Sequence, residues 1–83
     1  MLIFTDSAFR HGYSEDDFYE VLESGALKMR SRRGLKDVYE LYGRNYAGDY
    51  LHIAYRREKI RDVVFHMRRM SVQEKRLFRR MTG

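Results

Sequence analysis

Two histidines, three arginines and a carboxylate recur at alternate positions of three strand-like runs. The runs cover about residues 38–45, 50–56 and 62–69. Alternate side chains of a strand point to opposite faces of a sheet. One face then collects a core of Tyr39, Leu41, Leu51, Ile53, Tyr55, Val63, Phe65 and Met67. The other face collects side chains that bind phosphate and move protons, with their neighbours: Glu40, Tyr42, Arg44, Tyr50, His52, Arg56, His66 and Arg68.

This set of side chains fits the cleavage of RNA without a metal. A base must take the proton of the 2′-hydroxyl, cations must stabilise the charge on phosphorus, and an acid should protonate the departing 5′ oxygen. Histidine titrates near neutral pH, so His52 and His66 are candidates for base and acid, in either order. Arg44 and Arg68 can hold the non-bridging oxygens, because a guanidinium presents a fixed two-pronged donor.

Other residues on this face have supporting roles in the same hypothesis. Glu40 can orient a histidine or act as the base itself. Tyr42 and Tyr50 can stack on an unpaired base. Further cations for the substrate come from Arg56 and Arg61. Each residue also has a simpler explanation as part of a solvated or packed sheet face, and we expect His11 to be structural.

Metal and cofactor sites are not predicted. The three histidines lie far apart in the sequence and form no His-x-x-x-His pair. There is no glycine-rich phosphate loop and no cysteine. We therefore expect no bound metal and no cofactor.

Charge is distributed unevenly along the chain. The 83 residues suit a single domain, 1–83, and carry a net charge of +5. Residues 1–27 have a balance of −5, residues 28–55 of +3, and residues 56–83 of +7. A basic half of this kind attracts a polyanion, and RNA and an acidic protein fit the charge equally well. The lack of cysteine, of a leader sequence and of an apolar run near ~20 residues predicts a cytoplasmic protein without a membrane partner.

The pattern of elements predicts an α+β fold. A short strand at residues 2–4 is followed by a helix to about His11 and a second helix from Ser14 to Gly25. A meander of strands comes next, and Ser71 with Glu74 forms a capping box that begins the last helix. We expect the two N-terminal helices and the C-terminal helix to pack on one face of an antiparallel sheet of three to five strands. The face with the histidines would then stay open.

Three segments carry motifs that can be compared with a known family. The first is His11-Gly12-Tyr13-Ser14 with the acidic run Glu15-Asp16-Asp17-Phe18. The second is Leu41-Tyr42-Gly43-Arg44, then Gly48 and Tyr50-Leu51-His52-Ile53. The third is Met67-Arg68-Arg69-Met70-Ser71 with Glu74 and Phe78. Together they resemble small bacterial toxins of the BrnT kind, in the RelE/ParE superfamily, with agreement in order and spacing from about residue 9 to residue 78.

The resemblance implies a ribonuclease toxin of a type II toxin-antitoxin system that slows translation by cutting RNA. It also implies a cognate antitoxin as protein partner and a sheet with helices on one side. Two positions depart from the family pattern. His66 stands where many members have a small residue, and Val63 stands where many have arginine, although Arg61 lies two residues earlier.

Two other classes of function remain open from the sequence. A small basic module could bind nucleic acid without cutting it, and it would depend on its arginines rather than on His52 and His66. A partner-binding protein could use the same face as an interface, since tyrosine and arginine are frequent at interface hot spots.

Overall fold

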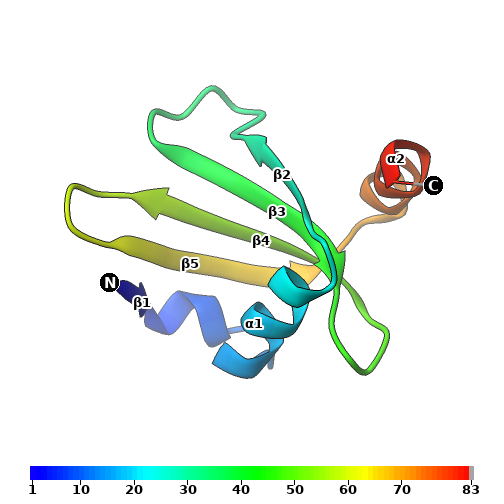
Figure 1. Cartoon of the computed structure of the whole chain (residues 1–83), viewed down its shortest axis with the longest axis horizontal. Coiled ribbons are helices and arrows are strands. Elements are labelled where there is room, and N and C mark those ends of the chain that lie inside the picture. The colour runs from blue at the N-terminus through cyan, green and yellow to red at the C-terminus, as the bar shows by residue number, and fades with distance from the viewer. Residues whose placement is uncertain (83) are drawn as a thin grey trace.

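The computed structural model describes residues 1–82 and has the expected α+β architecture (Figure 1). Its sheet is five-stranded, in the order β1-β5-β4-β3-β2. Along the chain the elements are β1 (Leu2–Phe4), the 3₁₀ turn η1 (Asp6–Phe9), α1 (Glu15–Glu23), β2 (Leu27–Arg30), β3 (Val38–Arg44), β4 (Tyr50–Arg57), β5 (Asp62–Arg69) and α2 (Val72–Thr82).

The sheet is mixed, not wholly antiparallel as predicted. Strands β2 to β5 form an antiparallel meander, whereas β1 pairs with β5 in parallel, Leu2 opposite Asp62. Short hairpins force neighbouring strands to alternate in direction. The chain instead leaves β1 through η1 and α1 before it reaches β2, and a long connection imposes no direction on the edge strand.

The predicted N-terminal helices are one helix and one turn. The first is a four-residue 3₁₀ turn, and the chain continues to Gly12 at φ +87°. The second begins as expected at Ser14, whose backbone N–H donates to Asp17 Oδ2 at 2.8 Å in a capping box. It ends before Gly25, which takes a φ of +82° that suits glycine.

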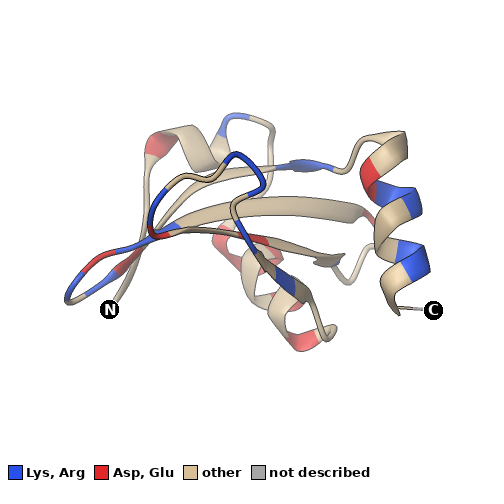
Figure 2. Ribbon diagram, turned by 90° about the horizontal axis from the view of Figure 1, so that it is seen from above, with Lys and Arg blue, Asp and Glu red and all other residues tan. Residues whose placement is uncertain are grey.

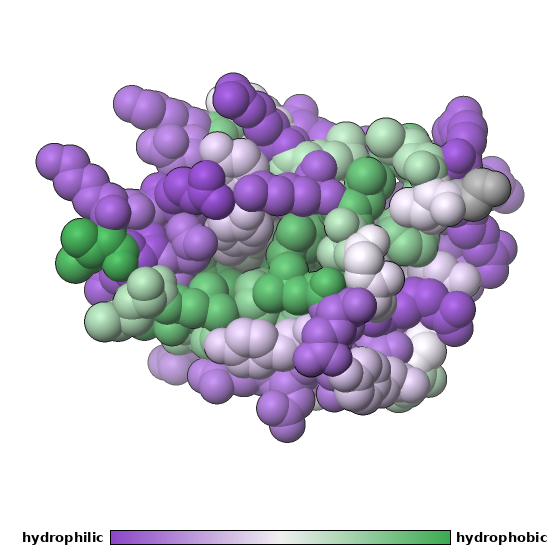
Figure 3. Space-filling view, in the orientation of Figure 1, coloured by the Kyte–Doolittle hydropathy of each residue, from purple (hydrophilic) through white to green (hydrophobic). Residues whose placement is uncertain are grey.

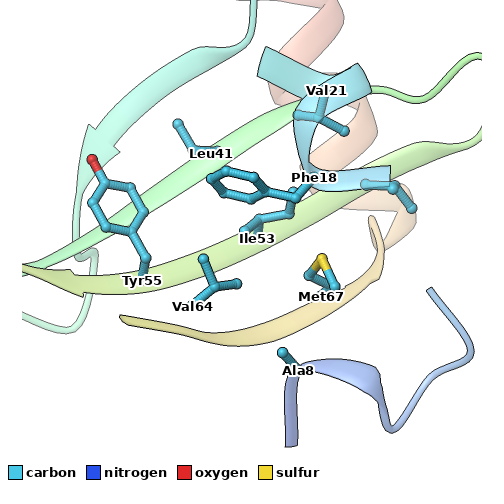
Figure 4. Close-up of a cluster of buried hydrophobic side chains, with 9 residues drawn as sticks. Ala8, Phe18, Val21, Leu41, Ile53, Tyr55, Val64 and Met67 are labelled. Carbon is cyan, nitrogen blue, oxygen red and sulfur yellow. The ribbon is translucent and has the colours of Figure 1, made fainter. Parts of the chain in front are cut away.

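The core lies between α1, η1 and one face of the sheet (Figure 4). Val21 of α1 sits directly over Gly43 of β3. A Cβ at position 43 would approach Val21 Cγ1 to 2.9 Å, so glycine allows helix and sheet to come close. The buried side chains of this core come from several strands and both N-terminal helical segments: Ala8, Phe18, Val21, Leu41, Leu51, Ile53, Tyr55, Val64 and Met67.

A bulge in β5 changes the predicted register. Tyr55 lies opposite Val64 and Ala54 lies opposite His66, so Phe65 is the additional residue. A bulge of this kind shifts the alternation of the strand by one position. The cluster under α1 therefore takes Val64 in place of the predicted Val63 and Phe65. Val63 is buried as predicted, but it alternates with Val64 and lies on the other face, as does Phe65, which lines the groove there. His66 and Arg68 lie beyond the bulge and keep the predicted face.

The C-terminal helix α2 is not on the same face as α1, contrary to the prediction. In Figure 1 α1 lies in front of the strands, whereas α2 stands beyond their ends. Its residues line a groove on the opposite face, and none of them is buried. Its start at Ser71 is as predicted, with Glu74 Oε1 accepting from the Ser71 N–H at 2.8 Å.

The surface divides by charge and by polarity. Acidic residues gather on α1, and lysines and arginines recur along α2 (Figure 2). On the face that carries α1, apolar side chains are visible within a hydrophilic rim (Figure 3). Phe9 of η1 and Leu22 of α1 contribute to the exposed apolar surface at 38% and 45% exposure. Neither helix described within residues 1–82 has the length and apolar character needed to cross a bilayer.

Candidate functional site

A groove of about 910 Å³ lies on the sheet face opposite α1. The middle strands supply its base with Glu40 from β3, His52 from β4, and His66 and Arg68 from β5. The loop after β2 and the inner side of α2 form its two sides. The four residues predicted to carry the chemistry are therefore brought together. His52 and His66 lie on adjacent antiparallel strands, as expected.

Glu40 is the centre of a buried hydrogen-bond network. Its Oε1 lies 2.8 Å from His52 Nε2 and accepts from the Tyr42 hydroxyl at 2.6 Å. Its Oε2 accepts from the backbone N–H of Arg32 at 2.7 Å. Glu40, His52 and Tyr42 are 9%, 7% and 1% exposed. This network fixes His52 and also ties the loop after β2 to the sheet.

The network holds a charged carboxylate beside a neutral imidazole. Burial by itself raises the pKa of Glu40, but the hydrogen bonds from Tyr42, Arg32 and His52 outweigh it and lower the pKa overall. Burial and the bond to Glu40 raise the pKa of Tyr42 to about 12, so the phenol stays protonated and donates. Burial lowers the pKa of His52 below its ordinary value, against the opposing effect of Glu40.

Neutral His52 must then carry its proton on Nε2, where it donates to the Glu40 carboxylate. Its other nitrogen, Nδ1, is buried and has no hydrogen-bond partner within residues 1–82. An imidazole with one nitrogen on Glu40 and the other enclosed does not exchange protons with a molecule in the groove. In this conformation His52 positions its neighbours.

Three imidazoles form a row that leads from this network to the surface. The His52 and His66 ring centroids are 5.5 Å apart, and the His66 and His11 centroids are 5.7 Å apart, with edge-to-face packing at both contacts. His66 is half-buried, and His11 is exposed. Burial lowers the pKa of His66, and the neighbouring basic side chains of His52, Arg68 and His11 lower it further. His66 is thus a neutral base at neutral pH.

His11 was expected to be structural, and sequence reasoning missed its place beside His66. It lies in the loop between η1 and α1, on the border of a second, smaller hollow shared with Arg68. Nothing in the local pattern indicates this contact, because residues 11 and 66 meet only through tertiary packing. The one available signal was the position of His11 in the segment His11-Gly12-Tyr13-Ser14, which resembles BrnT-like toxins.

Arg68 is held by a carboxylate of α2. Its Nη1 and Nη2 donate to Glu74 Oε1 and Oε2 at 2.7 and 2.9 Å, and Nη1 also donates to the Arg69 carbonyl at 2.8 Å. Burial acts to raise the pKa of Glu74, but the bonds from Arg68 and the Ser71 amide bring it down to about 2. In this bidentate pair Glu74 occupies the two guanidinium donors of Arg68 that would otherwise bind a phosphate.

The predicted substrate-binding residues lie outside this groove. Tyr42 is buried under Glu40, so it offers no ring face for stacking on a base. Arg56 and Arg61 both pair with Glu58 at the β4–β5 turn, towards the far end of the sheet from Arg68. Arg44 and Tyr50 pair across the end of β3 and β4 and do not line the groove.

Cations from outside the three strands that were predicted to carry the site do line the groove. Arg32 and Arg33 come from the loop after β2, and Arg80 comes from the last turn of α2. The basic turn 32–33 before Gly34 was a usable signal that the strand pattern obscured. Within residues 1–82, no three His, Asp or Glu side chains are grouped so that they could hold a metal ion.

Comparisons with known proteins add no family assignment. No protein-family model matches the sequence, and no curated protein is significantly similar to it.

Proposed function

We propose that this protein cleaves RNA in the groove on the open sheet face, with His66 as base and Arg68 as phosphate ligand. The observation that supports this most is the convergence of a half-buried neutral imidazole, an arginine and a second, exposed imidazole at one end of an open groove. The types of side chain match the needs of the reaction, and their positions are set by the sheet.

The reaction begins when His66 removes the proton of a ribose 2′-hydroxyl. The 2′ oxygen then forms a bond to phosphorus, and the bond from phosphorus to the 5′ oxygen breaks. The leaving oxygen takes a proton from a second imidazole, for which exposed His11, 5.7 Å from His66, is the candidate. The products are a 2′,3′-cyclic phosphate and a 5′-hydroxyl, and no metal takes part. General acid–base catalysis of this kind contributes ~10²–10⁴-fold to a rate.

Arg68 must exchange Glu74 for the phosphate before it can act. Carboxylate and phosphate both present two oxygens to a guanidinium, so the substrate can take the place of Glu74. The exchange requires α2 to shift. None of the residues of α2 is buried, so this shift exposes little core. Charge that develops on the phosphorane is stabilised by Arg68, with Arg32 and Arg33 nearby in the groove.

His52 and Glu40 act as positioning residues. The Glu40 carboxylate fixes the His52 ring, and His52 packs edge-on against His66. Together the Glu40–His52 bond and the His52–His66 packing hold the His66 ring in one orientation. A base with a single orientation loses less entropy when the substrate binds.

The biological role that we propose is that of a toxin in a type II toxin-antitoxin system, which slows translation by cutting RNA in the cytoplasm. It is based on the resemblance of the three segments to BrnT-like toxins, together with the basic C-terminal half. A cognate antitoxin would cover the same face as the RNA. Bound antitoxin and RNA cleavage should therefore exclude each other, and a complex that cuts RNA at the full rate would contradict this.

A second candidate is a module that binds nucleic acid without cutting it. In the structure Nδ1 of His52 is enclosed, and Glu74 occupies the guanidinium donors of Arg68. Neither group is free to act on a substrate in this conformation, and this favours a protein that does not cleave. The two functions differ in what His66→Ala does. An enzyme loses cleavage and keeps most of its RNA affinity, whereas a binding module keeps its function.

The experiment that tests the proposed function is induced expression in a bacterial host. Wild type, Arg68→Ala and the matched surface variant Arg76→Ala are compared by growth and by the integrity of transcripts. We expect wild type and Arg76→Ala to arrest growth and degrade RNA, and Arg68→Ala to do neither. Equal toxicity of all three proteins, or arrest with intact transcripts, would count against a ribonuclease.

A further inference from the structure

Three cations converge on a single aromatic ring at the end of the sheet. Arg44 Cζ, Lys75 Nζ and Arg79 Cζ lie 4.7, 4.4 and 5.4 Å from the centroid of the Tyr50 ring. Arg44 ends β3, Tyr50 begins β4, and the other two are one helical turn apart on α2. Phe78 packs edge-on against the same ring at 5.9 Å. We call Arg44, Tyr50, Lys75 and Arg79 the Tyr50 cluster.

The Tyr50 cluster contains no acidic partner. No Asp or Glu of residues 1–82 lies within 4.0 Å of its three cations, and Arg44 has only the Gly48 carbonyl at 3.4 Å. By contrast, the five arginines at the β4–β5 turn and at the end of β5 are paired with Glu58, Asp62, Glu74 and Asp49. Lys75 and Arg79 also repel each other across one helical turn.

The ring of Tyr50 partly compensates this repulsion. Its electron-rich faces attract the cations, and the nearby Arg79 lowers the pKa of its hydroxyl. With cations around it and Phe78 at its edge, the ring is not free to stack on a nucleobase. Its role is to gather positive charge at one point of the surface, and an anion bound there would complete the neutralisation.

The Tyr50 cluster adjoins the groove. Tyr50 is two residues from His52 on β4, which is about 6.8 Å along a strand and on the same face. Arg68 of β5 lies opposite His52 of β4, so the cluster is next to Arg68, the proposed phosphate ligand. Lys75 and Arg79 belong to α2, whose other side lines the groove with Glu74 and Arg80. A chain of regularly spaced anions leaving the groove would meet the cluster next.

We propose that the Tyr50 cluster is a second phosphate site, which holds the RNA backbone next to the phosphate that is cut. This inference rests on the proposed function and extends it to the path of the strand. Repeated phosphates fit better than the carboxylates of an acidic protein, because the cluster adds a second point of positive charge next to Arg68 along the sheet. The site recognises the backbone and not the bases.

Binding of an RNA that cannot be cut tests this site separately from catalysis. The probe is a 2′-O-methyl RNA octamer with a fluorescent end, titrated by anisotropy at 50–200 mM salt with wild type, Lys75→Gln and Arg79→Gln. Arg76→Gln is the matched control, since it removes the same charge from an exposed position of α2 outside the cluster. His66→Ala is included to show that binding does not depend on the catalytic base.

Each cluster variant should lose one phosphate contact. For a single strand the slope of log K against log salt changes by ~0.7 per contact, so the fall in affinity over this fourfold salt range should shrink by ~2.6-fold. Arg76→Gln should keep the wild-type slope. Cluster variants with the same slope as Arg76→Gln would overturn the inference while leaving the proposed function standing.

Two other outcomes are informative. If the wild type does not bind the octamer at all, the proposed function itself fails. A polyglutamate peptide serves as the acidic competitor. If Lys75→Gln weakens binding of polyglutamate but not of the octamer, the cluster is a docking point for an acidic protein, and the assignment to RNA is overturned.

Discussion

Replacing Glu74 by glutamine isolates the ion pair that closes the proposed phosphate site. The glutamine side chain would still accept the Ser71 N–H at the start of α2, because a capping box takes either residue. The variant therefore leaves the helix start in place and removes the charge that faces Arg68. Arg68 is partly exposed, so water can replace the lost carboxylate.

The pKa of Glu74 sets the size of the expected loss. It falls from an ordinary 4.5 to about 2 in the folded protein. Each pKa unit corresponds to ~1.4 kcal/mol, which gives ~3 kcal/mol as an upper bound. The Arg68 side chain is 32% exposed, and solvent screens the pair. We therefore expect Glu74→Gln to lower the free energy of unfolding by about 1–2 kcal/mol at pH 7.

The loss depends on pH with a definite sign. A carboxyl with a lowered folded pKa stabilises the protein above its unfolded pKa, here 4.5, and ceases to do so as the pH falls through about 2. Wild type and Glu74→Gln should therefore differ at pH 7 and converge between pH 4.5 and 2. Removing the competing carboxylate should also tighten binding of RNA, because Arg68 becomes available.

Thermal unfolding followed by circular dichroism measures the stability difference. For a domain of this size a loss of ~1–2 kcal/mol lowers Tm by about 4–16 °C. Glu58→Gln is the control, since it removes the same charge from solvent-exposed ion pairs with Arg56 and Arg61 and should lower Tm by less than Glu74→Gln does. Equal Tm values for the two variants, with no pH dependence specific to Glu74, would refute the reasoning.

Further predictions concern the network, the core and the histidines. Tyr42→Phe removes a buried bond to a carboxylate and should cost about 1.5–3 kcal/mol in urea unfolding, and a neutral result would contradict the Glu40 network. Gly43→Ala should cost about 1–3 kcal/mol by the same measurement, because its Cβ would meet Val21; full stability would mean that α1 is not packed there. The pKa values of His52 and His66 are lowered by burial, so the protein should lose stability as the pH falls from above 6.5 through these lowered values. His66→Gln should flatten that dependence, and an unchanged profile would argue against a half-buried His66.

The sequence was sufficient to predict much of the fold and the centre of the site. Alternation in β3 and β4 gave the correct faces, because a regular strand keeps a period of two residues. Alternation in β3, β4 and β5 predicted that Glu40, His52, His66 and Arg68 share one face, and in the structure all four line one groove. Capping signals at residues 14 and 71 identified the starts of both helices.

Features that arise from packing were not predictable in this way. The bulge at Phe65 interrupts alternation without a glycine or proline to mark it, so Val63 and Phe65 were assigned to the wrong face. On the side where α2 lies, its Glu74 pairs with Arg68 of β5, a contact that no local pattern reports. The contact of His11 with His66 spans 55 residues and appears only when the whole chain is folded.

The most direct test of the central claim is the chemistry of the cut ends. Purified wild type and His66→Ala are incubated with a labelled RNA in the presence of EDTA, and rates, product ends and RNA affinity are measured. The wild type should produce 2′,3′-cyclic phosphate and 5′-hydroxyl ends, and His66→Ala should cut ~10²–10⁴-fold more slowly with its affinity retained. Ends that carry a 3′-hydroxyl and a 5′-phosphate, or a His66→Ala variant that cuts at the wild-type rate, would contradict the account.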